Sequence, residues 1–140
     1  MILFLDTSVL LRVLLNQRPL LPEWATWTRA YASEILLVEA RRAVDRHRLA
    51  ANLNDSQITQ AHAALRSMEN GLEIVSLDRA ILERASLPMP SAVGTLDAIH
   101  LVSALFVREM REPDLQFATH DHELGRAAQG YGFTYLGQDT

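Results

Sequence analysis

The 140-residue sequence contains no cysteine and no lysine. The absence of cysteine excludes disulfides, thiolate zinc sites and cysteine nucleophiles, and it favours a reducing compartment, for which we expect the cytoplasm. Because lysine is absent, all 13 basic residues are arginine, which excludes lysine-dependent chemistry but retains bidentate binding of phosphate. Only the apolar run 2–5 separates Met1 from Asp6, so we expect neither a signal peptide nor a membrane-spanning segment.

The sequence also lacks a net positive charge. The formal net charge of -4 argues against a protein that binds nucleic acid through its overall charge, and a local basic patch would be needed instead. Hydrophobic residues make up 49% of the chain, and neither a linker nor an internal repeat interrupts it. A chain of this length can bury about 68% of its unfolded surface. We therefore expect one globular domain over residues 1–140.

Hydrophobic periodicity and turn residues predict strands that alternate with helices. The predicted strands are 2–5, 72–77, 115–119 and 133–136. The predicted helices are 8–15, 23–31, 33–51, 55–70, 79–85 (capped by Asp78), 96–110 and 123–129. Parallel neighbouring strands need crossover helices, so this order predicts an α/β fold. We expect a central, mainly parallel sheet of four to five short strands with helices on both faces.

Two aspartates come directly after predicted strands. Asp6 follows strand 2–5, and Asp121 follows strand 115–119. Functional groups of open α/β sheets collect at the carboxyl ends of the strands, so both acids are expected at the same edge. Asp6 needs a partner or a metal ion, because it ends a fully apolar, buried strand.

Four short motifs, in this order, resemble the PIN domain: Leu5-Asp6-Thr7-Ser8, Glu39 with Arg42, Thr95-Leu96-Asp97-Ala98-Ile99-His100, and Ala118-Thr119-His120-Asp121. The resemblance covers essentially the whole chain. Within that family, the size and the order of motifs look like VapC-type toxins of bacterial type II toxin-antitoxin modules, which are ribonucleases restrained by a small partner protein. It implies a PIN-like three-layer fold, an RNA substrate, a cognate VapB-like antitoxin and a homodimer.

The resemblance also implies site residues. The catalytic and metal-binding acids would be Asp6, Glu39, Asp97 and Asp121, with hydroxyls from Thr7, Ser8 or Thr119 nearby. Glu34 is an alternative to Glu39. Crowded carboxylates repel one another unless a cation neutralises them, and oxygen ligands favour Mg²⁺, with Mn²⁺ as a possible substitute. Such an ion would activate a water for in-line attack on phosphorus.

The helix that carries Glu39 also carries a run of arginines: Arg41, Arg42, Arg46 and Arg48. At least one could bind an RNA phosphate, and Arg42 is the first choice, although it could equally orient Glu39. His100 lies one turn after Asp97 and is expected to be a core histidine rather than a general acid.

Two other enzyme classes are excluded, because the sequence lacks residues that they require. A receiver-type phosphoacceptor domain needs a lysine, and a phosphatase of the haloacid-dehalogenase kind needs aspartates two apart where this chain has Ser8. The alternative from another class is a noncatalytic PIN-like module that binds RNA or protein, since a fold does not guarantee activity. The presence of all four acids favours the enzyme.

Overall fold

The computed structural model describes residues 1–138, which build one parallel sheet flanked by helices. The strands are β1 (Ile2–Leu5), β2 (Arg29–Ser33), β3 (Glu73–Val75), β4 (Gln116–Ala118) and β5 (Tyr135–Leu136). The helices are α1 (Thr7–Leu14), α2 (Ile35–Leu49), α3 (Asp55–Asn70), α4 (Arg79–Ala85), α5 (Thr95–Met110) and α6 (His122–Gly130). The strand order is β3-β2-β1-β4-β5, and each neighbouring pair is parallel. Within residues 1–138, no helix has both the length and the apolar character needed to cross a membrane.

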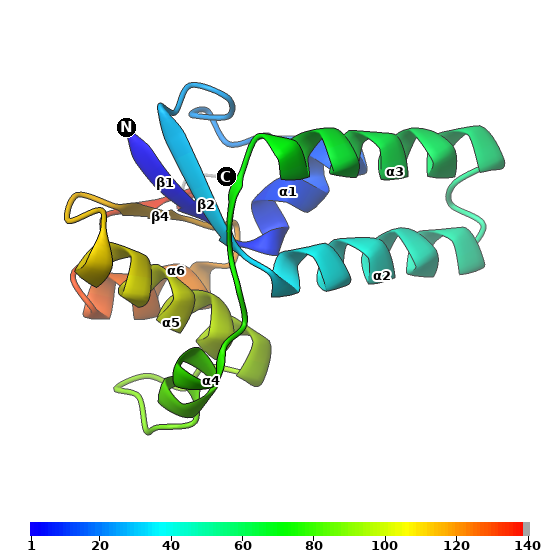
Figure 1. Cartoon of the computed structure of the whole chain (residues 1–140). Helices are drawn as coiled ribbons and strands as arrows, with labels where there is room; N and C mark the ends of the chain where they lie inside the picture. Colours follow the sequence, from blue (N-terminus) through cyan, green and yellow to red (C-terminus); the bar gives the residue numbers. More distant parts are fainter. Residues whose placement is uncertain (139–140) are drawn as a thin grey trace.

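Helices cover both faces of the sheet, as predicted for an α/β three-layer fold (Figure 1). Side chains of the central strand β1 alternate between the faces, because successive residues of a strand point in opposite directions. Leu3 and Leu5 pack with Val9 of α1 on one face, where α2 and α3 also lie. Phe4 packs against α5 and α6 on the other. The predicted fold class is therefore confirmed.

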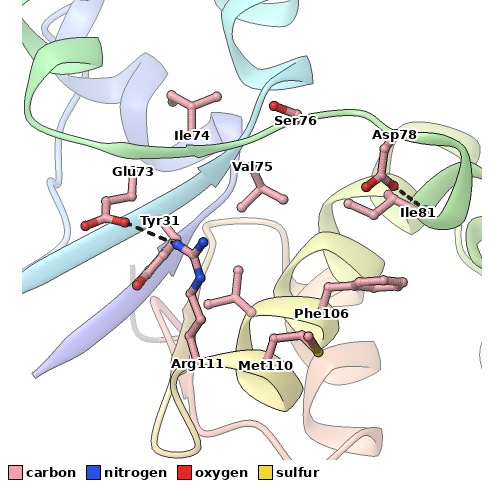
Figure 2. Close-up of a pocket in the computed structure, with 11 residues that line it drawn as sticks. Tyr31, Glu73, Ile74, Val75, Ser76, Asp78, Ile81, Phe106, Met110 and Arg111 are labelled. Carbon is pink, nitrogen blue, oxygen red and sulfur yellow. Dashed lines mark hydrogen bonds and ion pairs between the residues drawn. The ribbon is translucent and has the colours of Figure 1, made fainter.

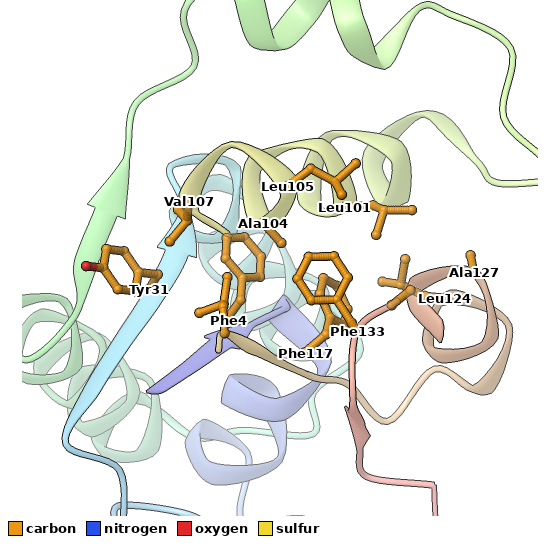
Figure 3. Close-up of a cluster of buried hydrophobic side chains, with 12 residues drawn as sticks. Phe4, Tyr31, Leu101, Ala104, Leu105, Val107, Phe117, Leu124, Ala127 and Phe133 are labelled. Carbon is orange, nitrogen blue, oxygen red and sulfur yellow. The ribbon is translucent and has the colours of Figure 1, made fainter. Parts of the chain in front are cut away.

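Aromatic rings fill the face that α5 and α6 cover (Figure 3). Phe4 of β1 stacks on Phe117 of β4 with ring centroids 5.5 Å apart, and Phe117 contacts Phe133 at 5.8 Å. Leu101 of α5 and Leu124 of α6 close this cluster and are fully buried. Each such side chain contributes about 1.5–3 kcal/mol by leaving water, so this core fixes β1 beside β4.

The predicted helix over residues 23–31 is wrong. Residues 22–25 form turns, and the segment Arg29–Ser33 is strand β2, which lies between β1 and β3. Trp24 and Trp27 pack edge to face at 5.0 Å against the cluster around Leu3. The short sequence Arg-Ala-Tyr-Ala-Ser has no strong strand pattern, and it becomes a strand because both of its edges are paired.

Side-chain caps begin two helices, and the cap predicted at Asp78 is confirmed. The Asn54 side chain accepts a hydrogen bond from Gln57 N, and the Gln57 side chain bonds back to Asn54 N, so α3 begins with a capping box. Asp78 accepts a hydrogen bond of 2.9 Å from the backbone N–H of Ile81 and begins α4. Asp78 therefore has a structural role.

We predict that Gly125→Ala destabilises the fold while Gly130→Ala does not. Both glycines lie in α6, but a Cβ at Gly125 would overlap the ring of Tyr135, whereas a Cβ at Gly130 meets no atom within 4 Å. Gly125→Ala should lower the free energy of unfolding by about 1–3 kcal/mol, measured by urea denaturation. Gly130→Ala should leave it unchanged or raise it by up to about 1 kcal/mol. Equal midpoints for the two variants would contradict the packing of β5 on α6.

Candidate active site: an acidic pocket at the sheet edge

The topology brings the ends of β1 and β4 together. The chain leaves β1 toward β2 and β3 on one side and later returns to β4 on the other, which makes this junction the switch point of the sheet. The backbone N–H of Asp6 donates to the carbonyl of Ala118 at 3.2 Å, so Asp6 and Thr119 lie side by side. Gly137 has φ +105° and lies directly against the Thr119 carbonyl, where a side chain would not fit.

Asp6 is buried and held by hydroxyl groups. Only 4% of the residue is exposed. Ser8 donates to Oδ1 through its hydroxyl at 2.6 Å and through its backbone N–H at 3.1 Å, and the Thr119 hydroxyl donates to Oδ2 at 2.6 Å. Burial raises the pKa of Asp6, and it outweighs the charge of His100 and these hydrogen bonds, which lower it. A cation at this carboxylate would therefore be favourable.

Glu39 is oriented by two side chains from other helices. The Thr7 hydroxyl of α1 donates to Oε1 at 2.7 Å, and Nε2 of His100 in α5 lies 2.5 Å from the same oxygen. Burial raises the pKa of Glu39, but the hydrogen bond and charge of His100, the Thr7 hydroxyl and Arg46 together lower it. Glu39 is thus ionised, and an ionised carboxylate only accepts, so Nε2 of His100 carries the proton.

His100 departs from its expected role as a core histidine. It is buried as predicted, with 1% exposed, but it contacts Glu39 instead of only filling the core. Its position three residues after Asp97 places both on one face of α5, which is the signal that sequence reasoning had available.

Asp97 and Asp121 complete the acidic group. Asp97 lies in the first turn of α5, and its pKa is raised by burial and by the negative charges of Asp121, Asp6 and Glu39, which outweigh His100. Asp121 begins α6 and accepts hydrogen bonds from Glu123 N at 3.0 Å and Leu124 N at 3.1 Å. The rise in the pKa of Asp97 indicates that the other three carboxylates lie close enough to repel its charge.

These side chains line a cavity of about 210 Å³. Its lining residues are Asp6, Thr7, Ser8, Leu11, Glu39, Arg46, Asp97, His100 and Asp121. The structure thus brings together all four predicted acids with Thr7 and Ser8. Thr119 does not line the cavity, but its hydroxyl donates a hydrogen bond to Asp6.

Two predicted alternatives lie outside the pocket. Glu34 is exposed at the start of α2, so Glu39 is the glutamate that lines the pocket. Arg42 is not among the lining residues, because its guanidinium pairs with Asp45 at 3.2 Å on the exposed side of α2. Arg46, one turn later, lines the pocket instead.

A larger cavity of about 360 Å³ lies elsewhere, between β3 and helices α4 and α5 (Figure 2). Phe106 and Met110 project into it from α5, and at its other end Arg111 lies 3.8 Å from Glu73. Its two acids already have partners: Glu73 pairs with Arg111, and Asp78 caps α4. Size therefore favours this cavity, but the chemistry favours the acidic pocket.

The acidic pocket suits a hard cation by its donor type. Its ligand candidates are carboxylate oxygens supported by hydroxyls, which Mg²⁺ and Mn²⁺ prefer. Within residues 1–138, no three Asp, Glu or His side chains are already arranged to hold a metal ion. Protein donors bind both carboxylate oxygens of Asp6, but only one oxygen each of Glu39 and Asp121.

Comparison with known proteins agrees with the fold and the motifs. The PIN domain model matches residues 3–130. Over 139 residues the chain is 29% identical to "Ribonuclease VapC47" of Mycobacterium tuberculosis (strain CDC 1551 / Oshkosh), with 94% of this chain and 93% of that protein covered.

Two solved structures share the fold. The structure of FitAB bound to an IR36 DNA fragment has a TM-score of 0.64 and 20% identity over 96% of this chain and 93% of that chain. VapBC-1 from nontypeable Haemophilus influenzae has a TM-score of 0.60 and 14% identity over 96% of both chains. The family match spans most of the sequence, including Asp6, Glu39, Asp97 and Asp121. The chain therefore belongs to the PIN domain family.

Proposed function

We propose that this chain is a metal-dependent endoribonuclease, the toxin of a bacterial toxin-antitoxin module, which hydrolyses RNA phosphodiester bonds in the acidic pocket. The observation that carries the proposal is the gathering of four carboxylates at the switch point of the sheet. Burial disfavours the ionised form of Asp6, burial and repulsion from neighbouring acids disfavour that of Asp97, and a bound cation would offset both costs. We assign Asp6, Glu39, Asp97 and Asp121 to holding Mg²⁺, with Mn²⁺ as a substitute.

The protein's own contribution is to orient the carboxylates. Thr7 and His100 bind Oε1 of Glu39, and within residues 1–138 the other oxygen accepts no protein hydrogen bond. In the same part of the chain the carboxylate of Asp97 accepts none. These oxygens are therefore available to a cation. When bound, such an ion supplies activation of a water for attack on phosphorus and stabilisation of the leaving oxygen.

We propose RNA as the substrate because the similar protein from Mycobacterium tuberculosis is named a ribonuclease. We also propose that a VapB-like antitoxin binds this chain and that the chain forms a homodimer. The support for the antitoxin is the similarity to VapC47 and the fold shared with VapBC-1.

We predict that the purified chain cleaves total cellular RNA only with Mg²⁺ or Mn²⁺. Asp6→Asn and Asp97→Asn should each lower the rate by at least about 100-fold, the order of magnitude for loss of one group that stabilises a transition state. Asp78→Asn is the matched control, because Asn also caps helices and Asp78 lies outside the pocket. Gel analysis of RNA over time, with EDTA as the metal-free condition, measures these rates.

Equal cutting by the two pocket variants and the wild type would contradict the proposed active site. Absence of cutting by folded, metal-loaded wild type on varied RNAs would instead favour a noncatalytic RNA- or protein-binding module.

We predict that Asp97→Asn stabilises the metal-free protein and abolishes its stabilisation by Mg²⁺. At neutral pH the variant removes a charge that burial and the neighbouring acids disfavour. Because Asp97 is only half-buried, the gain in free energy of unfolding should not exceed about 1 kcal/mol. Mg²⁺ at 100 times its Kd should stabilise the wild type by about 2.7 kcal/mol. Thermal melts in EDTA and in Mg²⁺ measure both effects, and equal responses of variant and wild type to Mg²⁺ would refute the assignment of Asp97.

A further inference from the structure

Helix α2 carries four arginines, and three of them form ion pairs with acidic residues. Three have acidic partners: Arg41 lies 3.7 Å from Glu69, Arg42 lies 3.2 Å from Asp45, and Arg48 lies 2.8 Å from Asp45. Arg46 forms no ion pair with any residue in the described range 1–138. Its charge is therefore available to a ligand.

The unpaired arginine faces the acidic pocket. Arg46 follows Glu39 by seven residues, which is two helical turns and about 10 Å along the axis on the same face. Ala43, between them on this face, is small and buried, and the long side chain of Arg42 is paired with Asp45. Side chains of a helix lean toward its N-terminus, which directs Arg46 back toward Glu39. Arg46 lines the cavity and helps lower the pKa of Glu39.

A pocket of four carboxylates in a protein of net charge -4 repels a polyanion, and a fixed positive charge beside the pocket would offset this repulsion in addition to a bound cation. Within residues 1–138, Arg46 is the only arginine that lines the pocket. A guanidinium can bind a phosphate with two parallel hydrogen bonds. We infer that Arg46 binds an RNA backbone phosphate at the mouth of the acidic pocket and so positions the strand for cleavage. The identity of this ligand rests on the proposed ribonuclease function.

The test measures RNA binding without cleavage. The Asp97→Asn protein is compared with three double variants that add Arg46→Ala, Arg46→Lys or Arg42→Ala. The probe is a fluorescein-labelled, random-sequence pool of single-stranded RNA, followed by anisotropy between low and physiological salt. Arg42→Ala is the matched control, because Arg42 is an exposed arginine one turn away whose charge is paired. Alanine suits an exposed helix position, so folding should be retained.

Arg46→Ala should weaken binding of the pool about tenfold, the loss expected for one charge-assisted contact. It should also reduce the slope of log affinity against log salt by about 0.7, which corresponds to one phosphate contact on a single strand. Arg46→Lys should keep the slope and recover part of the affinity, since it restores the charge without the bidentate geometry. Arg42→Ala should match the parent.

The inference is refuted if Arg46→Ala leaves affinity and slope unchanged, if Arg42→Ala weakens binding equally, or if the parent protein does not bind the pool at low salt. Cleavage by the active protein is measured separately with the same arginine variants. Binding that depends on Arg46 in a protein that never cuts RNA would contradict the nuclease and leave the phosphate contact standing. RNA cleavage together with RNA binding that does not depend on Arg46 would support the nuclease and contradict the phosphate contact.

Discussion

The acidic edge of this molecule depends on the burial of the Asp6 carboxylate at the end of the central strand. Removing an ionised carboxylate from water costs several kcal/mol unless hydrogen bonds and opposite charge compensate. Ser8 supplies two hydrogen bonds from the start of α1, and Thr119 supplies one from the segment after β4. The raised pKa of Asp6 shows that this compensation is incomplete. The hydrophobic core that pairs β1 with β4 therefore holds Asp6 in a buried position that disfavours its negative charge.

Much of the site could be predicted because its acids sit at positions with simple signals. Asp6 and Asp121 directly follow strands that the hydrophobic pattern identifies, and parallel strands bring their carboxyl ends to one edge. Asp97 opens a long, apolar helix whose start is marked by Gly94 and Thr95. These features are local in the sequence, so they are visible before any tertiary contact is known.

What could not be predicted depends on partners distant in the chain. Strand β2 gains its structure from pairing with β1 and β3, which its own five residues do not reveal. Arg42 and Arg46 both follow Glu39 at helical spacing, so the sequence does not distinguish them. The structure does, because Arg42 pairs with Asp45. His100 was expected in the core because sequence spacing alone does not show that Glu39, 61 residues away, lies beside it.

The four acids come from four separate segments of the chain: the end of β1, the middle of α2, the first turn of α5 and the residue that begins α6. The last of them, Asp121, is 115 positions after Asp6. Synthesis proceeds from the N-terminus at about 5–20 residues per second. A nascent chain that ends before β4 has neither Thr119 to hold Asp6 nor Asp121 to complete the pocket. The growing polypeptide thus has no assembled pocket until the segment that carries Thr119 and Asp121 has been made.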